Sequence, residues 1–172
     1  MTVLKGYDCD IVICGGGVIG ASLACLLGEA NFNVVLLDRE PPKKIESKAD
    51  DSRILAVTVA SERILKTTGA WSYFAEEKIS PFREMHVWDE NGDGKICFES
   101  ASICEPVMGY IIEYNVIANA LHKRISCLEN VNYISGVSPK LIKKEIDAIN
   151  IETDNGRKLK TKLLVGADGS NS

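Results

Sequence analysis

Histidine, paired cysteines and long apolar runs are scarce or absent in this 172-residue sequence. The two histidines, His86 and His122, stand in no metal-ligand spacing, so a zinc site is not expected. The six cysteines include no C-x-x-C pair, which favours free thiols used as small apolar residues in a reducing compartment. No uninterrupted apolar stretch approaches the roughly 18–20 residues that cross a bilayer. A zinc centre, a disulfide scaffold and a transmembrane segment are therefore not predicted.

The charge balance and the first residues of the chain exclude further kinds of partner and of targeting segment. A formal net charge of −4 gives no overall positive field, so no nucleic-acid partner is predicted. Strand-like residues begin within about ten residues of Met1, which leaves no room for a signal or an amphipathic presequence. The hydrophobic content of 45% and charged content of 26% are typical of a globular domain with a buried core. The length suits one domain, or one domain and a small part of another.

The most informative stretch is residues 10–27, where an apolar run of strand character ends in three glycines and a segment of helical period follows. Gly15, Gly17 and Gly20 fit the pattern G-x-G-x-x-G. Gly15 permits a sharp turn off the strand, Gly17 lets a pyrophosphate approach the backbone, and Gly20 allows the helix to pack closely on the strand. The N–H groups and the positive end of the helix dipole would then face the phosphate charge.

An acidic residue follows the second predicted strand at the spacing that a dinucleotide-binding unit requires. Residues 33–37 indicate a buried strand, and Asp38 stands at its end, 18 residues after Gly20. Its carboxylate can accept hydrogen bonds from both ribose hydroxyls of an adenine nucleotide, and it would repel a 2′-phosphate. FAD or NAD is therefore favoured over NADP. An ordinary βαβ unit with a glycine-rich turn and no ligand is the alternative.

Two further helices are predicted after residues 39–51, a polar stretch that indicates a solvated loop. Ser61 is expected to cap the first helix and Gly69 to end it. Asn115 is expected to cap the second, which runs to about residue 127 with three apolar residues on one face: Ile117, Leu121 and Ile125.

Strands are predicted over residues 85–88, 95–98, 109–114, 131–135, 146–153, 157–162 and 163–165. The loop at residues 89–94 imitates the start of an EF-hand, but position 12 of that pattern falls on Ser100, so a β-hairpin is favoured over a calcium site. A second hairpin is expected around Asp154-Asn155-Gly156. Residues 163–165 are all apolar, which indicates a buried strand. This strand leads into Gly166-Ala167-Asp168-Gly169.

Parallel-type strands, crossover helices and antiparallel hairpins together predict an α/β nucleotide-binding sheet with β insertions. Ligands bind such sheets at the carboxyl ends of the strands, where both glycine turns, residues 15–20 and 166–169, fall. The second turn is not needed for NAD alone but suits a longer cofactor that is held along its length. A NAD-dependent dehydrogenase is therefore disfavoured.

The order of these motifs resembles the FAD-dependent aromatic hydroxylases of ubiquinone biosynthesis over essentially the whole chain. The stretches that carry the resemblance are Gly15-Gly16-Gly17-Val18-Ile19-Gly20 with Asp38, Asp51-Ser52-Arg53, Gly69-Ala70-Trp71, Val87-Trp88-Asp89, residues 109–115 and residues 163–172. The chain is most similar to the mitochondrial branch. The resemblance implies a glutathione-reductase-type FAD-binding domain over residues 1–172, in which residues 80–114 contribute strands to an incomplete, β-rich substrate domain.

The resemblance also implies the residues that bind FAD. Arg53 would contact phosphate or flavin oxygens, with a surface ion pair to Asp50 or Asp51 as the alternative. Asp168 and Gly169 match a second cofactor motif, with an isolated turn as the alternative. Glu113 stands where relatives place a polar residue near the cofactor. The full predicted set is Gly15, Gly17, Val18, Ile19, Gly20, Asp38, Arg39, Arg53, Val137, Asp168 and Gly169.

The implied function is the hydroxylation of a polyprenylated phenol with FAD and O₂, in a ubiquinone-biosynthesis complex on the matrix side of the mitochondrial inner membrane. No catalytic side chain is predicted, because the flavin carries the chemistry. No metal is predicted, because neither histidine stands in metal-ligand spacing. Family members continue to a third motif, Gly-Asp-Ala, so this chain is expected to be an N-terminal part that binds FAD weakly and does not hydroxylate alone. A non-catalytic nucleotide-binding or assembly module that retains the fold is the alternative.

Overall fold

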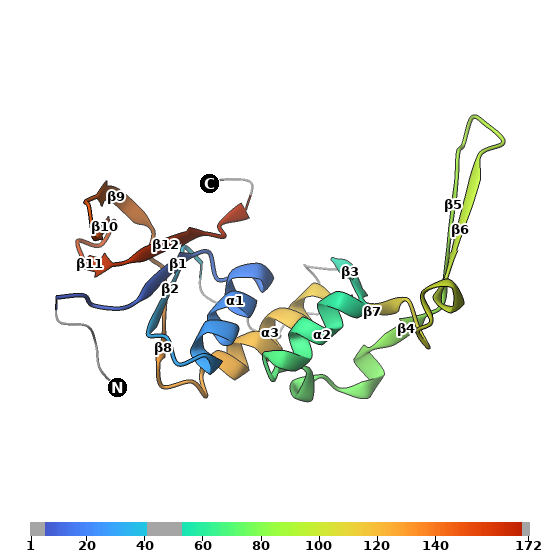
Figure 1. Ribbon diagram of the computed structural model, residues 1–172, viewed down its shortest axis with the longest axis horizontal. Helices are drawn as coiled ribbons and strands as arrows, with labels where there is room; N and C mark the ends of the chain where they lie inside the picture. The colour runs from blue at the N-terminus through green and yellow to red at the C-terminus, as the bar shows by residue number, and fades with distance from the viewer. Residues whose placement is uncertain (1–5, 41–52, 170–172) are drawn as a thin grey trace.

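The computed structural model describes residues 6–40 and 53–169, so residues 41–51 of the predicted loop lie outside the described part. Its centre is a parallel sheet with the strand order β12-β1-β2-β8 (Figure 1). The strands are β1 (Ile11–Cys14), β2 (Val34–Asp38), β8 (Val131–Ser135) and β12 (Leu163–Gly166). The predicted parallel sheet is confirmed.

Helices cover one face of this sheet. Helix α1 (Val18–Glu29) lies against β1, β2 and β8 and packs on α3 (Tyr114–Ile125), with α2 (Val59–Thr67) beside them (Figure 1). The side chains that alternate toward the helices are Ile11, Ile13, Val34 and Leu36, and they share a core with the predicted buried face of α3, Ile117, Leu121 and Ile125. That face of α3 is confirmed.

A three-stranded antiparallel sheet contributes the apolar residues that pack on the opposite face. It consists of β9 (Pro139–Lys144), β10 (Ile149–Thr153) and β11 (Lys158–Thr161), in the order β11-β10-β9. Its Ile151 and Leu159 share a core with Val12, Cys14, Val35 and Leu37, the other set of alternating residues in β1 and β2. Because β1 and β2 are buried on both faces, they are apolar at nearly every position.

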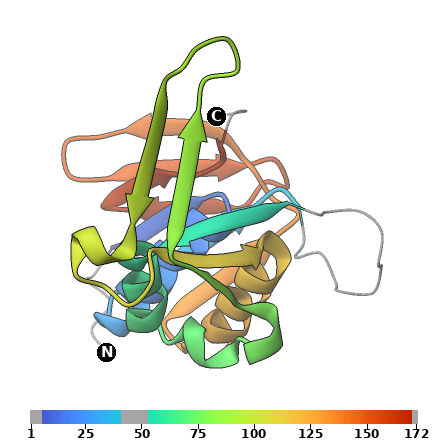
Figure 2. The same cartoon turned by 90° about the vertical axis from the view of Figure 1, so that its right-hand side faces the viewer.

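The remaining strands form a small sheet and a separate hairpin. Strands β3 (Ile54–Thr58), β7 (Gly109–Glu113) and β4 (Ser80–Phe82) pair antiparallel, and β5 (Glu84–Trp88) pairs with β6 (Lys95–Glu99). Figures 1 and 2 show this hairpin projecting away from the body of the molecule. Three short 3₁₀ helices complete the described elements: η1 (Ala70–Tyr73), η2 (Glu76–Lys78) and η3 (Ser100–Ile103). The predicted hairpin around residues 89–94 is confirmed.

Both predicted helix caps are wrong. Helix α2 begins at Val59, and the Thr58 side chain accepts a hydrogen bond from the Ser61 N–H at 3.3 Å. Helix α3 begins at Tyr114 and ends at Ile125, so Asn115 lies inside it. In both cases a strand continues directly into the helix. Each helix therefore begins before the residue, Ser61 or Asn115, that local capping preference selected. Gly69 does end α2, with a φ of 76°.

The C-terminal strands also differ from their predictions. Strand β9 was not predicted, because its lysines face solvent and mask the strand period. Strand β10 begins at Ile149 instead of residue 146, because Glu145 N–H bonds to the Ala148 carbonyl at 2.7 Å and closes a turn. Strand β12 is not fully buried: Leu163 is 49% exposed, since β12 is the edge strand of the parallel sheet. The hairpin of β10 with β11 is confirmed.

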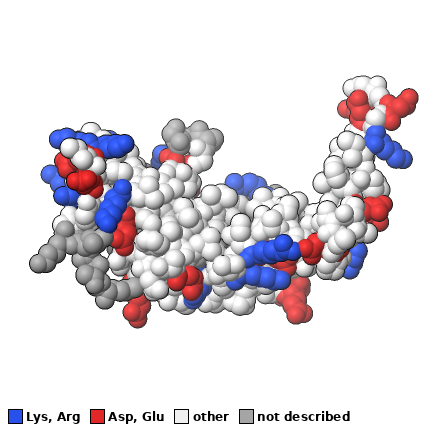
Figure 3. Space-filling view, in the orientation of Figure 1, with Lys and Arg blue, Asp and Glu red and all other residues white. Residues whose placement is uncertain are grey.

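Cysteines and charges complete the outline of the molecule. All six cysteines are free, and the three in the first βα unit (Cys9, Cys14 and Cys25) are buried as predicted. Figure 3 shows charges of both signs, with basic side chains gathered over the β9–β11 sheet. Within residues 6–40 and 53–169 there is no group of three or more metal-ligating side chains suited to an ion. In the same ranges no helix has the length and apolarity needed to cross a membrane.

Candidate dinucleotide-binding site

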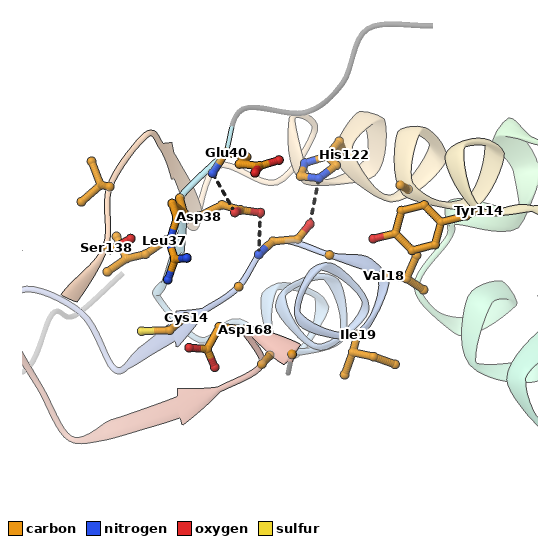
Figure 4. A pocket seen from close by; sticks show the side chains of 18 of the residues that line it. Cys14, Val18, Ile19, Leu37, Asp38, Glu40, Tyr114, His122, Ser138 and Asp168 are labelled. Carbon is orange, nitrogen blue, oxygen red and sulfur yellow. Dashed lines mark hydrogen bonds between the residues drawn. The ribbon is translucent and has the colours of Figure 1, made fainter. Parts of the chain in front are cut away.

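A hollow of about 750 Å³ opens where β1, β2 and β12 end (Figure 4). Its volume lies in the range of small-molecule and cofactor sites. Ten of the eleven predicted FAD-binding residues line it: Gly15, Gly17, Val18, Ile19, Asp38, Arg39, Arg53, Val137, Asp168 and Gly169. The structure therefore brings together both glycine turns and the acidic residue, which lie far apart in the sequence.

The first glycine turn is held between two strand ends. Gly15 has a φ of +107°, and a Cβ atom there would lie 2.3 Å from the Ala167 carbonyl oxygen. The Gly15 N–H donates to the Leu37 carbonyl at 2.8 Å, and the Ala167 N–H donates to the Cys14 carbonyl at 2.7 Å. Gly20 does not line the hollow. A Cβ there would lie 1.9 Å from the Gly15 carbonyl oxygen, so Gly20 allows α1 to start against the turn.

The middle glycine, Gly16, is a site residue that the motif did not single out. Its N–H donates to Asp38 Oδ2 at 2.8 Å, and its carbonyl oxygen lies 3.0 Å from His122 Nε2 (Figure 4). A Cβ at Gly16 would lie 2.5 Å from Asp38 Oδ2 and 3.1 Å from Tyr133 Cε2. The available signal was a glycine at this second position of the run, which the pattern G-x-G-x-x-G leaves open.

The start of α1 offers N–H groups to the hollow. Gly17 is the residue before the helix, and no side chain among the described residues caps it. The first turn of α1 carries no acidic residue. Val18 and Ile19 of this turn line the hollow. The first N–H groups of a helix have no partner within the helix, and they suit a phosphate oxygen.

Asp38 is held at the rim by two backbone N–H groups. Its Oδ2 accepts from Gly16, and its Oδ1 accepts from the Glu40 N–H at 3.1 Å. A carboxylate has about four acceptor sites, so the same oxygens can also accept from a ligand. The Asp38 carbonyl accepts from the Val137 N–H at 2.9 Å, which places Val137 beside the end of β2. The carboxylate is therefore oriented before any ligand binds.

Arg53 brings positive charge to the hollow from the start of β3. Its guanidinium carbon lies 4.1 Å from the centre of the Tyr114 ring, and its carbonyl accepts from the Tyr114 N–H at 2.8 Å. Asp50 and Asp51, the alternative ion-pair partners, lie outside the described residues. Glu113, which was expected near the cofactor, does not line this hollow, and its carboxylate lies 3.4 Å from Lys78 Nζ.

His122 is the second site residue that the sequence reasoning missed. It lines the hollow from α3, and its ring centre lies 4.8 Å from that of Tyr133. Burial lowers the pKa of His122, although the Gly16 carbonyl and Asp38 act against this shift. Asn115, Asn119 and His122 form the polar face of α3 in the hollow, opposite its apolar residues. The helical spacing of these three polar residues, four and then three positions apart, was the signal available in the sequence.

The second glycine turn lies beside the first, at the end of β12. Asp168 and Gly169 line the hollow, whereas Ser170, Asn171 and Ser172 lie outside the described residues. Figure 4 shows Asp168 close to Cys14. Burial raises the pKa of the Cys14 thiol to about 11, and the negative charge of Asp168 adds to this shift. Cys14 is therefore a neutral thiol at physiological pH.

The fold and this site define a class of protein, the FAD-binding domains. The family described as "FAD binding domain" matches residues 8–172, and the chain belongs to it. This membership confirms FAD as the predicted cofactor. Together with the relatives named below, it confirms the predicted resemblance to the ubiquinone-biosynthesis hydroxylases.

Several relatives of the chain carry the names of ubiquinone-biosynthesis monooxygenases or ubiquinone hydroxylases. The chain is 33% identical to "Ubiquinone biosynthesis monooxygenase COQ6, mitochondrial" of Homo sapiens over 178 residues, covering 95% of this chain and 38% of the relative. It is 29% identical to the 3-demethoxyubiquinol 3-hydroxylase of Escherichia coli (strain K12) over 164 residues, covering 95% of this chain and 42% of the relative. The chain thus spans about two fifths of the length of these relatives.

Solved structures share the fold at low sequence identity. The p-nitrophenol 4-monooxygenase PnpA from Pseudomonas putida DLL-E4 has a TM-score of 0.74 at 22% identity, with 95% of this chain and 41% of that chain covered. PqsL of P. aeruginosa in complex with 2-aminobenzoylacetate has a TM-score of 0.73 at 22% identity, with 95% and 44% covered. The predicted α/β fold, a parallel sheet with inserted antiparallel hairpins, is confirmed.

Proposed function

We propose that this chain forms the FAD-binding part of a flavin-dependent monooxygenase that hydroxylates a polyprenylated phenol in ubiquinone biosynthesis. The observation that carries the proposal is the meeting of two glycine turns and the Asp38 carboxylate in one hollow at the ends of parallel strands. Family membership and the names of the relatives support the reaction class.

The residues present fit FAD, each by its own chemistry. Gly17, Val18 and Ile19 line the hollow, and the N–H groups at this start of α1 would bind the pyrophosphate. Asp38 would accept hydrogen bonds from the adenosine ribose. Arg39 and Arg53 would offset the phosphate charge, and Gly15 and Gly20 would shape the turn.

The other strand ends complete the proposed site. Val137, at the end of β8, would flank the adenosine, and Asp168 with Gly169 would hold the cofactor further along its length. FAD, when bound, supplies the chemistry by which O₂ hydroxylates the phenol, while the chain binds and orients it.

Residues 80–114 are proposed to contribute strands to a substrate domain. In the β5–β6 hairpin, Met85 pairs with Phe98 and Val87 pairs with Ile96, so the four apolar side chains share one face. Each is between 44% and 57% exposed, and Figure 3 shows an uncharged stalk below a charged tip. A two-stranded hairpin is only marginally stable in water by itself. Further strands that cover this face would stabilise it and build an apolar wall for a phenol.

The cellular setting is proposed from the relatives alone. The mammalian relatives carry "mitochondrial" in their names. We assign this protein to mitochondria, on the matrix side of the inner membrane. There a ubiquinone-biosynthesis complex would deliver its polyprenylated phenol.

Two experiments test the proposal. Calorimetric titration of the purified chain with FAD is expected to show saturable binding, with NADPH much weaker because Asp38 repels its 2′-phosphate. A chimera of human COQ6 whose matched segment is replaced by this chain is expected to restore ubiquinone synthesis in cells that lack COQ6. An Asp38→Ala chimera is the matched control. A folded, FAD-loaded chimera that makes no ubiquinone would contradict the assigned reaction.

A further inference from the structure

Side chains from two different elements hold the two backbone polar groups of Gly16, which belong to the peptide units on either side of it. Asp38, at the end of β2, accepts the Gly16 N–H at 2.8 Å, and His122 of α3 lies 3.0 Å from the Gly16 carbonyl oxygen. Figure 4 shows the two contacts side by side above the glycine turn. Because a peptide bond is planar and trans, fixing the Gly16 carbonyl also fixes the direction of the Gly17 N–H at the start of α1.

The contact also defines the protonation of His122. A carbonyl oxygen can only accept a hydrogen bond, so Nε2 carries the proton in neutral His122. The ring packs on Tyr133, whose hydroxyl donates to the Glu40 carbonyl at 3.3 Å. Tyr133 stays neutral, because burial and the nearby Asp38 raise its pKa to about 12. The groups that face His122 are thus the Asp38 carboxylate of β2, the neutral Tyr133 of β8 and the Gly16 carbonyl.

While His122 is neutral, the charged side chains that line the hollow carry one more negative than positive charge. Two guanidiniums, those of Arg39 and Arg53, stand against three carboxylates, those of Asp38, Glu40 and Asp168. A pyrophosphate that enters this hollow adds negative charge. His122 is the lining group that can add a positive charge near neutral pH.

We propose that His122 is a positioning residue of the FAD site, which holds the Gly16–Gly17 peptide unit for phosphate binding and takes up a proton when the dinucleotide binds. This inference rests on the proposed function, since it assumes that the hollow binds FAD. In the free chain burial lowers the pKa of His122, which favours the neutral ring. Bound phosphate favours the charged ring, which still donates from Nε2 to Gly16.

The direction in which the affinity for FAD changes with pH follows from the coupling of proton uptake by His122 to binding. The pKa of His122 is higher in the complex than in the free chain, so binding takes up a proton between the two values. The gain in affinity is fully present below the pKa of the free chain, and it is lost as the pH rises through the pKa of the complex. The slope is at most about tenfold in affinity per pH unit.

Substitutions separate the hydrogen bond from the charge. His122→Gln keeps an N–H donor at the reach of Nε2 but cannot be protonated. His122→Phe keeps a ring against Tyr133 but has no donor. The matched control is His86→Gln, because His86 lies on the distant β5–β6 hairpin and is the other histidine of the sequence.

The experiment measures the dissociation constants of FAD and ADP-ribose by calorimetry between pH 5.5 and 8, with the whole chain. Neither ligand's pyrophosphate titrates in this range. At pH 8 the Gln variant is expected within about twofold of the wild type, and the Phe variant about tenfold weaker. Below pH 8 the wild type and His86→Gln gain affinity, whereas His122→Gln stays flat. Calorimetry in buffers of different ionisation enthalpy reports the proton uptake directly.

The outcomes are distinct. Equal affinity of the wild type and the Phe variant, or a pH profile unchanged in His122→Gln, overturns this inference and leaves FAD binding intact. If the wild type binds neither ligand at any pH, the proposed function and this inference both fall. Thermal unfolding of each variant checks that it folds. If the Phe variant does not fold, the pH profile of His122→Gln decides.

Discussion

Gly16 and Gly20 occupy positions where the Cβ of any other residue would meet another atom at less than a normal contact distance. At Gly20 a Cβ would lie 1.9 Å from a backbone oxygen, whereas at Gly16 it would lie 2.5 Å from the Asp38 carboxylate. A backbone atom cannot move without deforming the turn, but a side chain can rotate away. The two glycines therefore protect different properties, the fold at Gly20 and the placement of a carboxylate at Gly16.

Gly16→Ala is expected to weaken FAD binding about tenfold and to lower the free energy of unfolding by about 1 kcal/mol, because the new methyl group displaces Asp38. Gly20→Ala is expected to lower the free energy of unfolding by at least about 3 kcal/mol. Urea denaturation and FAD titration measure both effects. Gly94→Ala is the control, since its Cβ would meet only Asp89, at 3.9 Å. Equal effects of Gly16→Ala and Gly20→Ala on stability and on FAD binding would contradict the different roles assigned to the two glycines.

Asp38→Ala is expected to weaken FAD binding by about 1.5–3 kcal/mol, because a charged hydrogen-bond acceptor is lost, while the fold stays intact. Calorimetry gives the affinity and circular dichroism the fold. Asp93→Ala, in the exposed tip of the hairpin, is the control and should bind FAD like the wild type. Unchanged affinity in Asp38→Ala would remove this carboxylate from the site.

Cys14 is expected to resist alkylation at pH 8, because a thiol with a pKa of about 11 is then only about one thousandth thiolate. Its reaction with iodoacetamide should speed up as the pH rises toward that value. Mass spectrometry of the labelled chain identifies each modified cysteine, with the exposed Cys104 as the internal reference. Labelling of Cys14 at the rate of Cys104 at pH 8 would contradict the environment described for β1.

At the scale of elements, direct continuations of strand into helix decide where α2 and α3 begin. Thr58 is the last residue of β3 and also the capping residue of α2. Glu113 ends β7, and α3 begins at the next residue. At the second of these junctions the chain passes from β7 into α3 without a loop, which places Tyr114 and Asn115 in the lining of the hollow.

Thr58→Ala is expected to lower the free energy of unfolding by about 1 kcal/mol, because the Ser61 N–H loses its partner at the start of α2. Urea denaturation measures the change. Ser61→Ala is the matched control, and it should cost less because its N–H remains capped. A larger loss in Ser61→Ala would restore Ser61 as the capping residue.

The sequence predicted elements best where burial is unambiguous. Strands β1 and β2 are packed on both faces, so they are apolar at nearly every position and both were predicted. Strand β9 was missed, because it is an edge strand whose lysines face solvent. Both caps were misplaced, because local preference favoured Ser61 and Asn115 while the strand registers had already fixed the helix starts.

The site was predictable to the extent that motifs define it. The two glycine turns and Asp38 each follow a strand, so the rule of carboxyl-end binding brought them together. Gly16 and His122 were missed, because their roles depend on contacts between β2, α3 and the first turn. Such contacts between distant elements have no fixed spacing along the chain.

At the scale of the whole molecule, the dinucleotide site and the projecting hairpin lie in different parts of the structure. The hollow is bounded by the ends of the parallel sheet and by α3, whereas β5 and β6 line no part of it. Figure 1 shows the hairpin standing apart from the sheets. FAD binding and the apolar face of the hairpin should therefore be separable.

The double substitution Val87→Ser with Ile96→Ser is expected to leave FAD affinity unchanged and to reduce the binding of a hydrophobic dye, because it removes a cross-strand apolar pair from an exposed face. Fluorescence titrations measure both. His86→Ser, on the other face of the same hairpin, is the control and should change neither. A loss of FAD affinity in the double variant would show that the hairpin and the site are coupled.

A crystal structure of this chain with FAD would test the proposed site without any intermediate assumption. The pyrophosphate is predicted against the N–H groups at the start of α1, with the adenosine ribose hydroxyls within hydrogen-bond distance of Asp38. A nucleotide bound elsewhere, with Asp38 turned to solvent and the glycine turns empty, would contradict the proposed binding mode.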